Sequence, residues 1–77
     1  MSIIEKLGPD YLFTEADVDE AWRLFAAQYE AGAPAPSDDE CEFIGLAHCA
    51  EQMHRKARVY PTLDEVMAAL QRRYAPR

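Results

Sequence analysis

The sequence predicts an all-α fold: a three-helix bundle with a short additional N-terminal helix, forming one helical domain over residues 1–77. Three observations lead to this prediction. Helix-start signals recur along the chain, and apolar residues between them repeat at spacings of three and four. No segment alternates apolar and polar residues as a half-buried strand does. A length of 77 residues with 49% apolar residues fits one small globular domain.

Each predicted helix begins with a capping signal. In a capping box, a Ser or Thr side chain accepts from the backbone N–H three residues later, and an acidic side chain there bonds back. The pattern occurs at Ser2–Glu5, Thr14–Asp17, Ser37–Glu40 and Thr62–Glu65. Glycine favours the left-handed geometry that ends helices, and proline cannot continue one. We therefore expect the helices to end at Gly8-Pro9, at Gly32, before Pro61 and at Pro76.

Apolar stripes predict which side chains the three long helices bury. The stripes comprise Val18, Ala21, Trp22, Phe25 and Tyr29, then Phe43, Leu46, Ala50, Met53 and Ala57, then Leu63, Val66, Met67, Leu70 and Tyr74. Phe13 precedes the cap Thr14 and is placed to pack on Val18 as a hydrophobic staple. We expect the segment 11–13 to pack across the bundle. The connecting loops are short, so consecutive helices are predicted to run antiparallel.

The third predicted helix carries a second, weaker apolar stripe of Cys41, Ile44 and His48. It lies roughly 100° or more around the helix from the main face. Two interpretations stay open: the chain's own neighbouring segments cover the stripe, or it is an interface for a partner or for a second copy of the chain.

The net charge of −6 makes nucleic acid an unfavourable direct ligand and a protein with a basic surface a better partner. Two predicted helix starts carry more acids than the helix dipole needs. Such rows of carboxylates can imitate phosphates, which predicts a non-enzymatic interaction module, a small acidic inhibitor of a nucleic-acid-binding protein. The candidate partner-binding residues are Asp17, Asp19, Glu20, Asp38, Asp39, Glu40 and Glu42.

Two alternatives remain beside this hypothesis. A self-associating domain would use Cys41, Ile44 and His48 as its interface and form a homodimer. Direct nucleic-acid binding would use the basic C-terminal part, which holds six of the eight Lys and Arg residues. However, these cations gather at predicted helix ends, where they complement the helix dipole, and the last helix begins with Asp64-Glu65.

The sequence contains no pattern typical of an enzyme or a metal site. Ligands on one helix converge at spacings of three or four. Cys41, His48, Cys49 and His54 are spaced by seven, one and five positions, and neither cysteine has a histidine three or four residues away. The three glycines form no phosphate-binding loop. We therefore predict no catalytic residue, no metal and no cofactor.

The cysteines and the hydropathy pattern bear on the compartment. Cys41 and Cys49 lie about 12 Å apart along one predicted helix, too far for a disulfide, and reduced thiols are typical of the cytoplasm. The first residues lack the charge and apolar run of a signal peptide, and no apolar stretch approaches the ~20 residues of a membrane span. We expect a cytoplasmic protein without membrane contact.

In length, acidity and four-helix plan the chain resembles the acyl carrier proteins. Those proteins carry phosphopantetheine on the Ser of an Asp-Ser-Leu motif at the start of their second long helix. The nearest match here, Pro36-Ser37-Asp38, lacks both flanking residues, which argues against a carrier function. Small acidic phage-borne inhibitors of bacterial defence systems are similar in size and charge, although no motif is shared.

Overall fold

The computed structural model describes residues 3–74. It contains four helices: α1 (Ile3–Leu7), α2 (Glu15–Ala27), α3 (Asp38–Ala57) and α4 (Leu63–Tyr74). In this part of the chain the only extended pairing is an isolated antiparallel bridge between Leu12 and Thr62. The all-α prediction is confirmed. The arrangement is also consistent with the predicted bundle preceded by a short helix.

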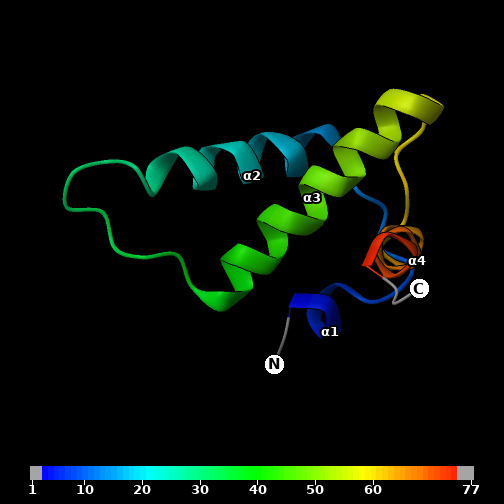
Figure 1. Ribbon diagram of the computed structural model, residues 1–77, viewed down its shortest axis with the longest axis horizontal. Helices are drawn as coiled ribbons and strands as arrows, with labels where there is room; N and C mark the ends of the chain where they lie inside the picture. The colour runs from blue at the N-terminus through cyan, green and yellow to red at the C-terminus, as the bar shows by residue number, and fades with distance from the viewer. Residues whose placement is uncertain (1–2, 75–77) are drawn as a thin grey trace.

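The central helix is α3, which contacts each of the other three (Figure 1). The α2 helix runs antiparallel to α3 at an inclined angle, as predicted. In contrast, α4 is seen nearly end-on in the same view, so it crosses α3 steeply. The antiparallel prediction is therefore wrong for α3 and α4. The turn between them accounts for the difference, because Arg58, which follows the last residue of α3, is in the left-handed conformation (φ 65°) and the chain changes direction there.

The segment between α1 and α2 pairs with the segment that enters α4. The backbone N–H of Phe13 donates to the Pro61 carbonyl (3.1 Å), and the N–H of Leu63 donates to the Tyr11 carbonyl (2.7 Å). The N–H of Asp64 donates to the Pro9 carbonyl (3.1 Å). Two first-turn donors of α4 therefore find acceptors outside their own helix. The prediction that segment 11–13 crosses the bundle is confirmed.

Three capping boxes form as predicted. The side chains of Thr14 and Asp17 cap each other's backbone N–H groups, as do those of Ser37 and Glu40. Thr62 and Glu65 bond in the same reciprocal way, at 3.2 and 3.3 Å. The fourth predicted box includes Ser2, and the last predicted helix end is at Pro76. Both residues lie outside the described part of the chain.

The predicted helix ends are partly wrong. Gly8 does follow α1, with φ 82° and its N–H donating to Ile4. However, α2 ends at Ala27 rather than at Gly32, which lies in a later turn with φ 78°. Tyr29 is therefore outside the helix whose stripe it was expected to extend. The third prediction holds, because α3 ends at Ala57 and Pro61 lies between α3 and α4.

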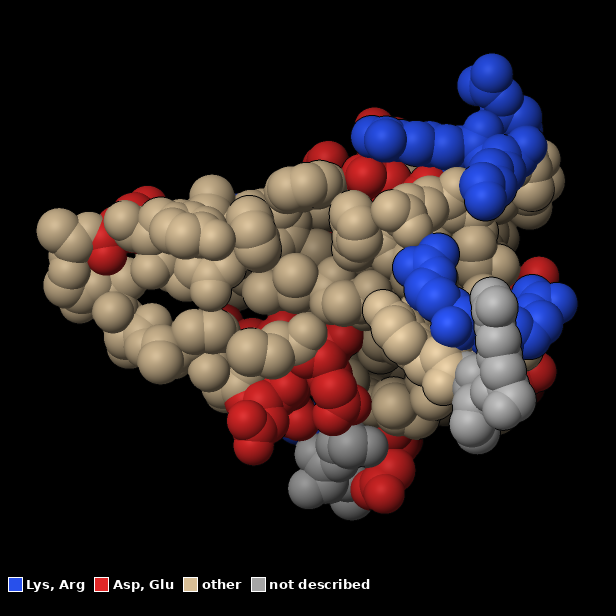
Figure 2. All heavy atoms as spheres, viewed as in Figure 1, with Lys and Arg blue, Asp and Glu red and all other residues tan. Residues whose placement is uncertain are grey.

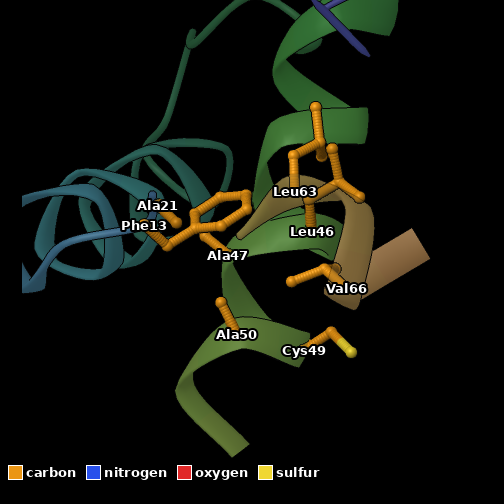
Figure 3. Close-up of a cluster of buried hydrophobic side chains, with 8 residues drawn as sticks. All are labelled: Phe13, Ala21, Leu46, Ala47, Cys49, Ala50, Leu63 and Val66. Carbon is orange, nitrogen blue, oxygen red and sulfur yellow. The ribbon is translucent and has the colours of Figure 1, made fainter. Parts of the chain in front are cut away.

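The core lies where α3 meets the 11–13 segment and α4 (Figure 3). Its buried residues are Phe13, Ala21, Leu46, Ala47, Cys49, Ala50, Leu63 and Val66. The inner parts of the predicted stripes are confirmed, and Phe13 and Val18 are both buried, as a hydrophobic staple requires. The outer parts are wrong: Trp22, Phe25, Tyr29, Ala57 and Tyr74 are exposed.

Candidate functional site

An apolar groove lies between α2 and α3. Its volume is about 280 Å³, and it is lined by Val18, Ala21, Trp22, Phe25, Ile44, Gly45, Ala47 and His48. The large side chains stand at its rim, where Trp22 is 48% exposed and Phe25 is 39% exposed. The deeper residues are small, since Ala21 and Ala47 are buried beneath them. The two helices thus approach each other without filling the space between them.

The aromatic rings at the rim form a ladder along the end of α2. Trp22 meets Phe25 edge to face at 5.9 Å between centroids, and Phe25 meets Tyr29 at 5.5 Å. Trp22 also meets the His48 ring edge to face at 6.1 Å. These contacts connect both walls of the groove. Their geometry is the favoured one for aromatic pairs.

Trp22 is held in place by α3. Its Nε1–H donates to Glu51 Oε2 at 3.0 Å, and the other oxygen of Glu51 pairs with Arg55 at 3.3 Å. The polar atom of the indole is therefore satisfied within the chain, and only its apolar body borders the groove. An aromatic side chain fixed in this way loses little conformational entropy on binding.

The second stripe of α3 is split between two hollows. Ile44 and His48 line the groove, with Ile44 half-buried and His48 exposed. Cys41 is exposed and lines a separate hollow of about 390 Å³ between α3, α1 and α4. Gly45 and His48 border both hollows. The stripe is thus a ridge with a hollow on each side, and neighbouring segments cover it only in part.

The seven candidate acids do not form one patch. Because α2 and α3 are antiparallel, their acidic starts lie at opposite ends of the pair (Figure 1). Desolvation raises the pKa of Tyr60, and the carboxylates of Glu15, Asp19 and Glu51 raise it further, so Asp19 lies near the end of α3. Figure 2 shows the other acidic group gathered over the start of α3.

Several of these acids serve the chain's own structure. Asp17 accepts from the Tyr11 hydroxyl at 2.8 Å as well as capping α2. Glu20 pairs with Arg23, and hydrogen bonding to this guanidinium lowers the pKa of Glu20. Asp39 pairs with Lys6 at 2.7 Å, which lowers the pKa of Asp39 in the same way. Part of the acid surplus therefore has a structural explanation.

The remaining candidates differ in their accessibility. Glu40 caps the Ser37 N–H at 3.2 Å. Glu42 is half-buried beside the second hollow, and its Oε1 is buried without a hydrogen-bond partner in the described part of the chain. Asp19 and Asp38 are exposed. Carboxylates with such different surroundings do not present a regular row to a single partner.

The basic residues of the C-terminal part occupy two separate places (Figure 2). Arg55, Lys56 and Arg58 lie at the end of α3, and Arg72 and Arg73 lie in the last turn of α4. His54 stacks on Tyr60 at 3.9 Å between centroids, and Arg73 donates to Gln52 at 3.4 Å. These cations flank the uncharged surface of α3 without forming one continuous strip.

Residues 3–74 contain no group of three or more His, Cys, Asp or Glu side chains placed to hold a metal ion. Cys49 is buried in the core and Cys41 is exposed, and both are free thiols. No helix within the described range is long and apolar enough to cross a membrane.

Comparisons with known protein families, with curated proteins and with solved structures find no match to this chain. The site is therefore defined by its own residues. Sequence reasoning missed Trp22 and Phe25 as site residues because it assigned them to the core. One available signal was the contrast between these aromatic residues on α2 and the small residues Gly45 and Ala47 on α3.

Proposed function

We propose that the protein is a non-enzymatic interaction module that binds another protein through the groove between α2 and α3. The observation that carries this proposal is the pair of exposed aromatic side chains, Trp22 and Phe25, over a floor of small apolar residues. Large aromatic residues beside an apolar hollow are typical of the energetic centres of protein interfaces.

The partner that best fits the groove is an amphipathic helix with a basic polar face. A groove between two helices accepts the apolar face of a third, which completes the packing that α2 and α3 leave open. The net charge of −6 favours a partner whose remaining surface carries Lys and Arg, because opposite charges speed association and exclude acidic competitors.

The acidic inhibitor hypothesis remains a second candidate. Its support is the group of acids at the start of α3, which includes the exposed Asp38. Against it stand the separation of the two acidic groups and the internal bonds of Asp17, Glu20 and Asp39. We therefore rank apolar docking above phosphate imitation.

Capture of partners from a lysate of the source cells can separate these mechanisms when three forms of the protein are compared. They are the wild type, the groove variant Trp22→Ser/Phe25→Ser, and a variant with Asp38, Asp39 and Glu42 changed to Lys. We expect a partner that stays bound in 1 M salt, where the Debye length falls to ~3 Å. The groove variant should lose it and the acid variant should retain it.

The opposite pattern would refute groove docking. A partner that elutes at moderate salt, is lost by the acid variant and binds the groove variant normally would support the acidic inhibitor instead. Circular dichroism of all three proteins provides the folding control. The substituted aromatic residues are exposed, so the groove variant is expected to keep its helix content.

A further inference from the structure

The ridge between the two hollows has a regular pattern along α3. Asp38, Cys41, Gly45, His48, Gln52 and Arg55 follow one another at spacings of three and four, which places them in one line along the helix. We refer to these six residues as the α3 seam. Five of the six are exposed and Gln52 is half-buried, so the line runs along the outer face of the central helix.

The α3 seam is complementary to itself when reversed. Its residues form three pairs that are equally distant from the middle of the seam: Asp38 with Arg55, Cys41 with Gln52, and Gly45 with His48. If two α3 helices pack antiparallel about this point, each residue meets its counterpart on the other copy. An acid then faces a base at both ends, and the smallest residue faces an imidazole ring at the centre.

The charges around the seam favour the same orientation. Acidic residues occupy the first turn of α3 and basic residues its last turn, where Figure 2 shows the Lys and Arg side chains beside further acids. A parallel pairing would bring like charges together at both ends, whereas an antiparallel pairing joins opposite ones. Arg55 is available for such a contact, because its side chain is 73% exposed even while paired with Glu51.

Gly45 would allow the backbones of two α3 helices to approach closely at the middle of the seam. A Cβ atom at this position would meet nothing within 4 Å among residues 3–74, and the φ of Gly45 is not in the left-handed region. The fold of one copy therefore has no need of glycine here. Between two antiparallel helices, a missing side chain at the centre lets the backbones come near and leaves space for His48 of the other copy.

The geometry points to a two-fold symmetric dimer in which the α3 helices of two copies pack antiparallel along the α3 seam. This inference rests on the proposed function, because the α3 seam shares Gly45 and His48 with the groove. It names a second copy of the chain as a binding partner of that surface. The seam alone is small for a stable interface. The two-fold axis places α2 of one copy beside α2 of the other, so the exposed Trp22 and Phe25 extend the contact.

Sedimentation equilibrium of the purified full chain, from about 1 to 200 µM, measures the dimer directly. Gly45→Gln should keep its helix content, since Gly45 is exposed and a Cβ there meets no described residue within 4 Å, and should weaken the dimer more than tenfold. Asp38→Arg and Arg55→Asp alone should each weaken it by roughly tenfold, because each dimer contains the pair twice. The double variant Asp38→Arg/Arg55→Asp should restore it.

The charge controls lie on α4. Asp64→Arg and Arg72→Asp make the same charge changes in the first and last turns of that helix, away from the seam. Both should dimerise like the wild type.

A cross-linking variant tests the register. In Gln52→Cys, mild oxidation should join Cys41 of one copy to the thiol introduced at position 52 of the other and give a covalent dimer. The two positions lie roughly 16 Å apart along one helix, too far for an internal disulfide. A wild-type dimer that instead cross-links rapidly through two Cys41 residues would indicate parallel helices and overturn the inference.

A chain that stays monomeric throughout the concentration range, or a dimer that is insensitive to Gly45→Gln, would also overturn it. These outcomes are distinct from failure of the proposed function. Self-association is measured on the purified protein, whereas groove docking is judged by loss of a foreign partner in Trp22→Ser/Phe25→Ser. Either result can hold without the other.

Discussion

Two apolar surfaces of α3 differ in what covers them. On one side Phe13, Leu63 and Val66 close over Leu46 and Ala50, and Phe13 is only 1% exposed. On the other side Trp22 and Phe25 reach over Gly45 and Ala47 but remain 48% and 39% exposed. Trp22 and Phe25 were predicted to be core like Phe13, whereas the second stripe of α3 was left open between burial and an interface.

The path of the connecting segments explains the difference. On the closed side, the 11–13 segment is tied by backbone hydrogen bonds to the residues that enter α4, which brings Phe13 into the core. On the open side, the loop after α2 swings away from the helices before it returns to α3 (Figure 1). An apolar side chain favours burial, but it is buried only where the course of the chain brings another segment over it.

The largest expected effect compares one phenylalanine on each side. Phe13→Ala should destabilise the protein by about 3–5 kcal/mol, since it removes a fully buried ring and leaves a cavity. Phe25→Ala should cost about 1 kcal/mol or less, because its ring is already partly in water. Urea unfolding followed by circular dichroism gives both values. Equal losses would show that the groove is as much a part of the core as Phe13.

The second prediction concerns Tyr11 on the closed side. Burial and the nearby Asp17 carboxylate raise the pKa of Tyr11 from 10.0 to about 12. The unfolded chain then releases this proton at lower pH than the folded one, so the stability is intact below pH 10 and falls as the pH rises towards 12. Thermal unfolding midpoints between pH 9 and pH 12 should record the decline.

Two variants serve as controls for this pH dependence. Tyr11→Phe should reduce the loss of stability between pH 9 and pH 12. Part of the loss should remain, because the pKa of Tyr60 is also raised. Tyr29→Phe changes an exposed tyrosine on the open side and should leave the slope as in the wild type. A wild-type slope in Tyr11→Phe would mean that the Asp17 contact does not hold the proton.

The smallest expected effect tests the open side at Gly45. Gly45→Ala should stabilise the isolated chain by about 1 kcal/mol, because alanine favours the helix and its Cβ meets nothing within 4 Å. The measurement is urea unfolding at a protein concentration low enough to avoid association. A loss of stability would show that α2 closes over Gly45 in solution and that the groove is filled.

The local features of the fold were predictable from short sequence patterns. The three capping boxes at Thr14, Ser37 and Thr62 form as expected, because each requires only residues within one helical turn. The inner residues of the apolar stripes are buried for a similar reason, since helical periodicity alone places them on one face. The left-handed C-cap of α3 was not predictable in this way, because Arg58 adopts that conformation without being a glycine.

The candidate site was predicted only in part. The second stripe was noticed from its spacing, but Trp22 and Phe25 were assigned to the core and Gly45 had no place in the site. The acids were counted correctly, while their separation depends on the antiparallel course of α2 and α3. Partners such as Lys6 for Asp39 lie far away in the sequence, so no local pattern indicates them.

The sequence by itself determined where the helices begin, which residues share each helical face, and the acidic balance of the chain, because these properties depend on near neighbours. The tertiary structure alone decided that the two faces of α3 differ, one closed by Phe13 and α4, the other left as a groove beneath Trp22 and Phe25. The physical reason is that burial is a property of pairs of segments. A stripe specifies one member of such a pair, and only the three-dimensional path of the chain supplies the other.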